Sequence, residues 1–313
     1  MCKFLMSLSL LCFCTFSYGE LIDHLKKAEG KGDGHTMRNI DFIYMINLDR
    51  RPQKYALSKQ YLEKYGVSPY RFSAVNGWEL TIEAINDIGV KYQPGMTPLL
   101  ATTYVERDGK KIPSHEFMSD SGKTYFVHCM SLGAMGCSLS HISILQDAYD
   151  SGYETIWVME DDVEVLGDVR QLSDLIDELD AVVGANHWDV LFTDFDYRVG
   201  VGKYAPASGA TKRPDMDCSP KERYSDKYTK KFQINDHFSK MAARFGTASM
   251  IIRRSGIIKL LEFSRNQNIY MPYDMENYLP PGIQRYCLTF DLVTNMLNSL
   301  SDIGAPDYLN TPQ

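Results

Sequence analysis

Short, nearly continuous apolar runs alternate along the chain with stretches whose apolar residues recur at helical spacing. The clearest runs cover residues 42–46 and 155–159, and such runs are typical of strands buried on both faces of a parallel sheet. Pro52 opens a helical stretch after the first run, and a further strand is predicted at residues 70–75. This strand–helix–strand order predicts an α/β fold, an open and mostly parallel sheet flanked by helices.

The same pattern continues towards the end of the chain. It predicts helices at residues 135–149, 172–183 and 255–263, and strands at residues 190–192 and 249–252. Strands that keep alternating with helices extend one α/β unit rather than start a separate fold.

Three segments depart from the pattern. Residues 20–40 are charged and bear several glycines, so we expect a flexible lead-in before one domain that covers residues 41–313. Residues 91–127 are rich in glycine, proline, threonine and charge, which indicates an insertion that carries a hairpin. Residues 198–239 are polar without a clear period, and connections of this length are usually functional loops or disordered.

Residues 1–19 have the pattern of a secretory signal peptide. Lys3 gives a short basic start, residues 4–16 form an apolar run, and Ser17 and Gly19 are small residues at the expected cleavage region. The run is too short for a stable transmembrane span, which needs about 20 apolar residues. We expect an exported protein that is secreted, periplasmic or in the lumen of the endoplasmic reticulum; without a working signal it would be cytoplasmic.

The formal net charge of the 313 residues is −7. This charge argues against a nucleic-acid partner, because neutralising phosphates needs a basic face. An acidic protein that binds an anionic nucleotide must therefore supply arginines locally, or a metal ion.

Four cysteines follow residue 19: Cys129, Cys137, Cys218 and Cys287. In an exported chain they are able to form two disulfides, but four separated thiols could equally be free and buried, and the sequence leaves both open. The absence of a CxxC pair argues against a zinc site.

Three consecutive carboxylates, Glu160, Asp161 and Asp162, follow the most apolar strand of the chain. The carboxyl end of such a strand is where open α/β sheets place their ligand crevice. Like charges this close repel unless a cation joins them, and hard carboxylate oxygens suit Mg²⁺ or Mn²⁺. The alternative is a solvated charge run that simply ends a strand.

Several motifs, taken in order, resemble glycosyltransferase family 25, which includes lipooligosaccharide galactosyltransferases of bacteria and collagen β-galactosyltransferases of animals. The matching segments are residues 46–51 (INLDRR), 136–141 (GCSLSH), 159–163 (MEDDV), 246–252 (GTASMII), 272–274 (PYD) and 301–303 (SDI). Each motif is weak alone, and their order makes the resemblance specific.

The resemblance implies a GT-A fold and inverting transfer of galactose or glucose from a UDP-sugar to a hydroxyl of a glycan or protein acceptor. It makes residues 160–162 a variant of the DXD motif that binds Mn²⁺ or Mg²⁺. Asp162 would then bind the metal directly, and Glu160 would bind it through water or contact the ribose. Asp161 would orient the group or contact the donor.

The resemblance also assigns the remaining site residues. Asn47, Arg50 and Arg51 would bind the nucleotide, His141 would contact the donor sugar, and Asp274 would be the general base for the acceptor hydroxyl. Simpler interpretations stay open: a solvated helix start for the arginines, a packing role for His141, and a helix N-cap for Asp274.

The roles of four further residues and two alternative functions also stay open. Asp194 and Asp196 depart from the family pattern and could touch acceptor or metal, or form a turn, while Asp236 and His237 are alternative metal ligands. A catalytically silent nucleotide-sugar or glycan-binding protein on the same fold is the main alternative function, and a nucleotidyltransferase is a third.

Overall fold

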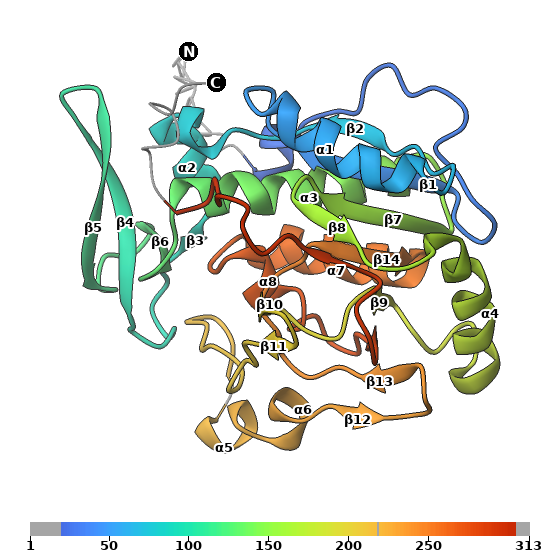
Figure 1. Ribbon diagram of the computed structural model, residues 1–313. Helices are drawn as coiled ribbons and strands as arrows, with labels where there is room; N and C mark the ends of the chain where they lie inside the picture. Colours follow the sequence, from blue (N-terminus) through green and yellow to red (C-terminus); the bar gives the residue numbers. More distant parts are fainter. Residues whose placement is uncertain (1–19, 218, 305–313) are drawn as a thin grey trace, which may run out of the picture.

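An eight-stranded mixed sheet lies at the centre of the computed structural model, which describes residues 20–217 and 219–304 (Figure 1). Its strands, in spatial order, are β12 (Phe232–Gln233), β13 (Phe238–Lys240), β15 (Arg285–Leu288), β9 (Val190–Phe192), β14 (Ser249–Arg253), β7 (Thr155–Glu160), β1 (Phe42–Asn47) and β2 (Tyr70–Ser73). The predicted signal peptide and Cys218 lie outside the described residues.

The α/β fold that the apolar pattern predicts is confirmed, and the sheet combines both strand directions. Strand β1 pairs in parallel with β2 and with β7, and β15 pairs in parallel with β9. Strand β14 runs antiparallel to both β7 and β9, so it joins the two parallel parts into one sheet.

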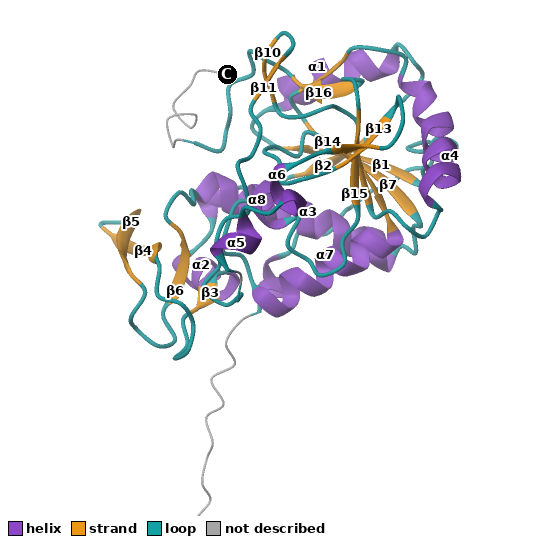
Figure 2. Ribbon diagram, turned by 90° about the horizontal axis from the view of Figure 1, so that it is seen from below, coloured by secondary structure: helices purple, strands orange, loops and turns teal. Residues whose placement is uncertain are grey.

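Helices cover both faces of this sheet (Figure 2). The helices are α1 (Pro52–Glu63), α2 (Ile82–Ile88), α3 (Leu132–Asp150), α4 (Leu172–Val183), α5 (Pro220–Arg223), α6 (Asp226–Thr229), α7 (Arg254–Gln267) and α8 (Tyr273–Glu276), with 3₁₀ turns η1 (Leu21–His24), η2 (Gly77–Glu79) and η3 (Val169–Gln171). Each predicted helix is found within a few residues of its expected bounds.

Strand β7 shows why its apolar run is continuous. Ile156 and Val158 point into the core cluster that includes residues of α3 and α7, whereas Trp157 and Met159 point into the cluster that includes residues of α1 and α4. Alternate side chains of one strand thus enter two cores, and both faces demand apolar residues.

The predicted insertion carries the expected hairpin. Strands β4 (Leu100–Arg107) and β5 (Lys110–Phe117) form an antiparallel pair, to which β6 (Thr124–Val127) and β3 (Val90–Lys91) add. Figure 1 shows this small sheet standing beside the main domain.

The lead-in differs from the expectation of a flexible segment, because it packs on the domain. Leu21 is only 2% exposed, and Lys31 pairs with Asp147 of α3 at 2.9 Å. Apolar and charged anchors a few residues apart are enough to hold a segment whose composition alone suggests a loose chain.

The polar segment from residue 198 to 239 is also tied down. It forms β10 (Arg198–Gly200), β11 (Lys203–Tyr204), α5, α6, β12 and the start of β13. Its Arg213 is 1% exposed and contacts Glu276 of α8, whose carboxylate accepts the backbone N–H of Tyr270 and of Met271 at 2.9 Å each. The segment thereby fixes the backbone that leads into α8.

A further pair of strands brings residues 293–295 beside the segment that follows β7. Strand β8 (Val163–Val165), which follows the three carboxylates, pairs antiparallel with β16 (Val293–Asn295). Within residues 20–217 and 219–304, no helix combines the length and apolar character that crossing a membrane requires.

We predict that Gly136→Ala destabilises the fold by about 1–3 kcal/mol, because overpacking against backbone has no easy relief. A Cβ on Gly136 would lie 2.5 Å from Gly77 N and 2.5 Å from Val75 O, where η2 meets α3. The gain in helix propensity from alanine, about 1 kcal/mol, does not offset this clash.

Urea denaturation checks this prediction. Gly32→Ala is the matched control, since a Cβ at Gly32 meets nothing within 4 Å. Equal stabilities for the two variants would contradict the close backbone approach.

Candidate functional site

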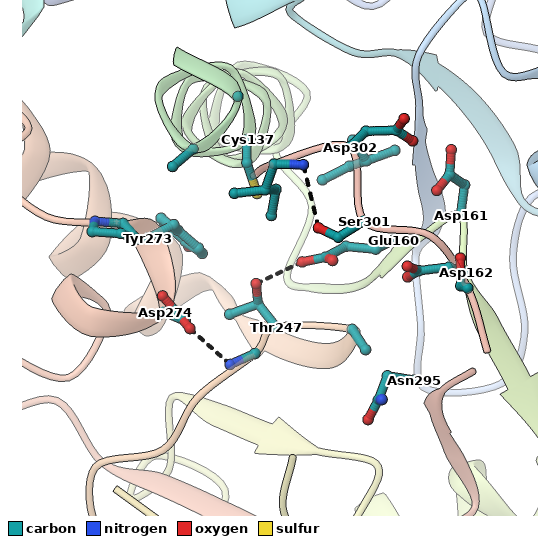
Figure 3. A pocket seen from close by; sticks show the side chains of 18 of the residues that line it. Cys137, Glu160, Asp161, Asp162, Thr247, Tyr273, Asp274, Asn295, Ser301 and Asp302 are labelled. Carbon is teal, nitrogen blue, oxygen red and sulfur yellow. Dashed lines mark hydrogen bonds between the residues drawn. The ribbon is translucent and has the colours of Figure 1, made fainter. Parts of the chain in front are cut away.

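A cavity of about 690 Å³ opens at the carboxyl ends of the parallel strands β1, β2 and β7 (Figure 3). Its wall includes Leu48 after β1, Val75 after β2, and the three carboxylates at the end of β7. The segment just before antiparallel β14, which includes Thr247, lines the same edge of the sheet. The cavity has the size and place of a ligand site in an open α/β sheet.

Two side chains contact the same carboxylate oxygen of Glu160. The Thr247 hydroxyl donates to Glu160 Oε1 at 2.7 Å, and His141 Nε2 lies 3.4 Å from the same oxygen. Burial by itself raises the pKa of Glu160, but the hydrogen bond and charge of His141, with the Thr247 hydroxyl and Lys54, outweigh it and lower that pKa. Of the three carboxylates, Glu160 is the one whose pKa is lowered, so it keeps its charge to lower pH than Asp161 and Asp162.

Asp161 is oriented by Asn47, which predictions from the sequence had placed against the nucleotide. Asn47 is 1% exposed; its Nδ2 donates to Asp161 Oδ2 at 2.6 Å and to the Arg51 carbonyl at 2.7 Å. The Arg71 Nε donates to Asn47 Oδ1 at 2.7 Å and fixes the amide. Burial, followed by the negative charge of Asp162, raises the pKa of Asp161 to about 7.

Asp162 shares its surroundings with Glu160. Burial and the negative charge of Glu160 raise the pKa of Asp162 to about 6. The Asp162 carbonyl accepts the Met296 N–H at 2.7 Å, which ties the end of β7 to the segment after β16.

The carboxylates of residues 160–162 fit a hard divalent cation, but only two of the three are placed to share it. In Figure 3, Asp161 points towards Asp302, away from Glu160 and Asp162. Two carboxylates, Glu160 and Asp162, are the usual protein contribution when Mg²⁺ is bound together with phosphate oxygens. A cation there would also favour the charged form of Asp162, which burial disfavours.

The two predicted arginines do not line this cavity. Arg50 is exposed and pairs with Glu79 at 2.9 Å, beside a smaller hollow of about 110 Å³. Arg51 is 9% exposed, and its Nε pairs with Asp302 at 3.0 Å. For Arg50, the interpretation as a solvated helix start describes the geometry.

Lys54, one turn further along α1, brings the positive charge that the sequence analysis assigned to the arginines. It lines the cavity, and its Nζ lies 2.8 Å from Asp302 and 2.6 Å from the Leu300 carbonyl. The charges of Asp161 and Asp162 also act on it, and although burial opposes this, the pKa of Lys54 is raised.

Asp274 lines the cavity opposite Asp162, as Figure 3 shows. The N-cap interpretation is wrong, because Pro272 occupies the cap position of α8 and Asp274 lies within that helix. Its Oδ2 accepts the Gly246 N–H at 2.9 Å. Burial raises the pKa of Asp274 despite that hydrogen bond, and the charge of Glu160 raises it further.

His141 lies behind the wall rather than on it. It is 1% exposed, and its ring stacks on Tyr273 with centroids 4.3 Å apart and planes 8° apart. Through Glu160 and Tyr273 it joins the two sides of the cavity.

Three other candidate residues form ion pairs with neighbouring side chains outside the cavity. Asp194 is 1% exposed and pairs with Arg244 at 2.7 Å, and Asp196 pairs with Lys231 at 2.6 Å. His237 pairs with Glu178 at 2.7 Å on the surface. None of these three acceptor or metal candidates lines the cavity.

Several cavity residues escaped the sequence analysis as site residues. Thr247, Tyr273 and Asp302 stand within motifs that carried the family resemblance, so their signal was present without a role. Lys54 and Asn295 gave no signal, because only the packing of α1 and the β8–β16 pairing bring them here.

The cysteines of the described residues are free. Cys129 is exposed, Cys287 is buried and Cys137 lines the cavity. Burial and the surrounding carboxylates raise the pKa of the Cys137 thiol well above its usual value.

The sequence matches the model of glycosyltransferase family 25 (LPS biosynthesis protein) over residues 40–276. A glycosyltransferase 25 family member of Drosophila melanogaster is 27% identical over 143 residues, which are 46% of this chain and 19% of that protein. Another of Aedes aegypti is 28% identical over 154 residues, 49% of this chain and 21% of that protein. A human protein named inactive glycosyltransferase 25 family member 3 is 28% identical over 153 residues, again 49% and 21%. The chain thus matches about a fifth of the length of these relatives.

We predict that Asp162→Asn stabilises the metal-free protein near neutral pH. A folded pKa above the unfolded value of about 3.9 means that folding favours the protonated form, so wild type loses stability as pH rises from about 4 to 6. Relative to the variant, wild type should lose about 1–3 kcal/mol over that interval.

Urea denaturation in the presence of a chelator, at several pH values, measures the gap. Asp236→Asn changes an exposed carboxylate and should follow wild type throughout. A gap between wild type and Asp162→Asn that does not vary with pH would contradict the buried charge.

Proposed function

The chain belongs to glycosyltransferase family 25, and from this premise we propose that it is an active, inverting, metal-dependent hexosyltransferase of the GT-A type. It moves galactose or glucose from a UDP-sugar to a hydroxyl of a glycan or protein acceptor. The proposal includes export directed by residues 1–19, so that the enzyme acts in a secretory lumen, in the periplasm or outside the producing cell.

One observation carries this proposal: motifs far apart in the sequence line a single cavity. The carboxylates at the end of β7 stand on one side of it and Asp274 on the other, with Thr247 between them (Figure 3). A nucleotide donor needs an anion-binding end and an acceptor needs a base, and this cavity offers both, on its two opposite sides.

At the nucleotide end, Glu160 and Asp162 would hold Mn²⁺ or Mg²⁺. When bound, the cation supplies Lewis-acid stabilisation of the negative charge that develops on the leaving diphosphate. Asn47 keeps Asp161 turned away from that pair, and Lys54 presents an ammonium group to the same region. Lys54 then exchanges its contact with Asp302 for a phosphate oxygen.

At the acceptor end, Asp274 takes the proton of the attacking hydroxyl. Single displacement at the anomeric carbon inverts its configuration and needs this proton to leave as the new bond forms. The Gly246 N–H donates to Oδ2 of Asp274 and so fixes this carboxylate in the wall of the cavity. The raised pKa of Asp274 makes it a stronger base than an ordinary aspartate.

A catalytically silent nucleotide-sugar or glycan-binding protein is the alternative function. The names of the human and mouse relatives, which call them inactive, favour it. The presence of Asp162 and Asp274 on opposite sides of one cavity favours the active enzyme, because a binding protein needs no base.

UDP release from UDP-galactose and UDP-glucose, with and without Mn²⁺, tests the proposal. We expect Mn²⁺-dependent release that increases with acceptor, and Asp274→Asn should lower turnover by about 10²-fold or more. Because asparagine still accepts the Gly246 N–H, UDP–Mn²⁺ affinity and melting temperature should persist in this variant. UDP–Mn²⁺ binding without turnover in wild type would favour the silent binding protein.

We predict that Lys54→Met raises the donor KM about tenfold, since a hydrogen bond to a charged group contributes about 1.5–3 kcal/mol. Arg50→Met is the matched control and should leave KM within about twofold, because surface ion pairs contribute little. Lys54→Arg should restore much of the affinity. An unchanged KM in Lys54→Met would remove Lys54 from the donor site.

A further inference from the structure

Cys137, His141 and Glu160 form a compact group at the inner wall of the cavity. Their thiol sulfur, imidazole nitrogen and carboxylate oxygen all lie within 4.8 Å of one another. Across residues 20–217 and 219–304, no other set of three histidine, cysteine, aspartate or glutamate side chains is this compact. In particular, the consecutive carboxylates of residues 160–162 do not converge in this way.

The local structure explains why the three meet. Cys137 and His141 are four residues apart in α3, so their side chains lie on one face of the helix. That face meets the carboxyl end of β7, where Glu160 stands. Stacking on Tyr273 holds the His141 ring with Nε2 at 3.4 Å from Glu160 Oε1, and the Thr247 hydroxyl donates to the same oxygen.

We propose that Cys137, His141 and Glu160 bind a thiophilic divalent cation such as Zn²⁺, distinct from the hard cation of the nucleotide site. Thiolate, imidazole and carboxylate are the ligands that Zn²⁺ takes, whereas Mn²⁺ and Mg²⁺ prefer oxygen donors alone. Three protein ligands leave one position open, and Cys137 lines the cavity from which a water or a substrate oxygen would fill it.

Metal binding at this site exchanges a proton for the metal ion and needs no oxidant. The Sγ–H bond of Cys137 breaks as the Sγ–metal bond forms, and the proton passes to solvent. His141 contributes the lone pair of Nε2, and any proton on that nitrogen also passes to solvent, while Glu160 contributes a carboxylate oxygen. No CxxC pair is needed, so the sequence argument against zinc does not apply to this site.

Zinc binding at Cys137, His141 and Glu160 has a consequence for the nucleotide site. This consequence rests on the proposed function, in which Glu160 also binds the cation of the nucleotide. A cation held by Cys137 and His141 recruits Glu160 and removes it from the Glu160–Asp162 pair. Occupation of the two sites is therefore mutually exclusive, and Zn²⁺ acts as an inhibitor that competes with Mn²⁺–UDP.

A titration of the reduced full-length protein with Co²⁺, without nucleotide, tests the site directly. We expect thiolate-to-cobalt charge-transfer absorption that saturates at one equivalent and vanishes in Cys137→Ser. Cys129→Ser removes an exposed thiol and should keep the absorption unchanged. An absent band in wild type, or a band that persists in Cys137→Ser, would overturn the proposal.

Calorimetry with two ligands separates this site from the nucleotide site. Cys137→Ser should weaken Zn²⁺ binding at least tenfold and leave Mn²⁺–UDP affinity within about twofold, while Asp162→Asn should do the reverse. Zinc affinity that is lost in Asp162→Asn and kept in Cys137→Ser would overturn the assignment.

A competition experiment tests the shared carboxylate. One equivalent of Zn²⁺ should lower the Mn²⁺–UDP affinity of wild type at least tenfold and have little effect in Cys137→Ser. Undiminished Mn²⁺–UDP binding in zinc-loaded wild type would overturn the shared use of Glu160. If wild type did not bind Mn²⁺–UDP at all, the proposed function would fail, and the cobalt spectrum would still decide the metal site.

Discussion

Three adjacent, half-buried carboxylates must be kept in a cavity wall at the end of a strand that is apolar on both faces, and much of the site follows from this constraint. Burial disfavours their charged forms, so each requires its own local partner. Glu160 has Thr247 and His141, and Asp161 has Asn47. Asp162 has a pKa raised to about 6, partly by the negative charge of Glu160, so a cation shared by these two carboxylates would favour its ionised form. The residues that hold these groups come from α3, β1 and the segment before β14, so the same contacts that satisfy the acids also assemble the cavity.

The parts of this arrangement that depend on local sequence could be predicted, and those that depend on packing could not. The run from Thr155 to Met159 needs apolar residues on both sides, so it identifies β7 and the acids at its end without further information. The sequence analysis assigned Arg50 to the nucleotide and gave Lys54 no role, because only the rotation of α1 on the sheet decides that Lys54 reaches the cavity and Arg50 faces solvent. Likewise, the four-residue spacing of Cys137 and His141 indicates a metal site only once the fold places Glu160 beside them.

The side of the cavity that carries Asp274 is built from residues that reach it across long stretches of chain. Arg213, deep in a segment whose composition suggests an irregular loop, contacts the Glu276 carboxylate that also accepts two backbone N–H groups just before α8. Asp194, a departure from the family pattern, forms a buried pair with Arg244. Breaking such a pair strands a charge in the interior, so these residues support the backbone around Asp274 although neither pair lines the cavity.

One wall of the cavity is synthesised well after the strand that carries the three carboxylates. Asn295, Ser299 and Asp302 line it, and β16 joins β8 only after more than a hundred intervening residues have been added. Domains generally fold from the N-terminal side as they emerge from the ribosome. A partly made chain can therefore complete β1, β7 and their helices while the acids at the end of β7 still face open solvent. The cavity is closed only once the segment around Asp302 has docked on Arg51 and Lys54, so an unfinished chain has the fold's core but not its enclosed site.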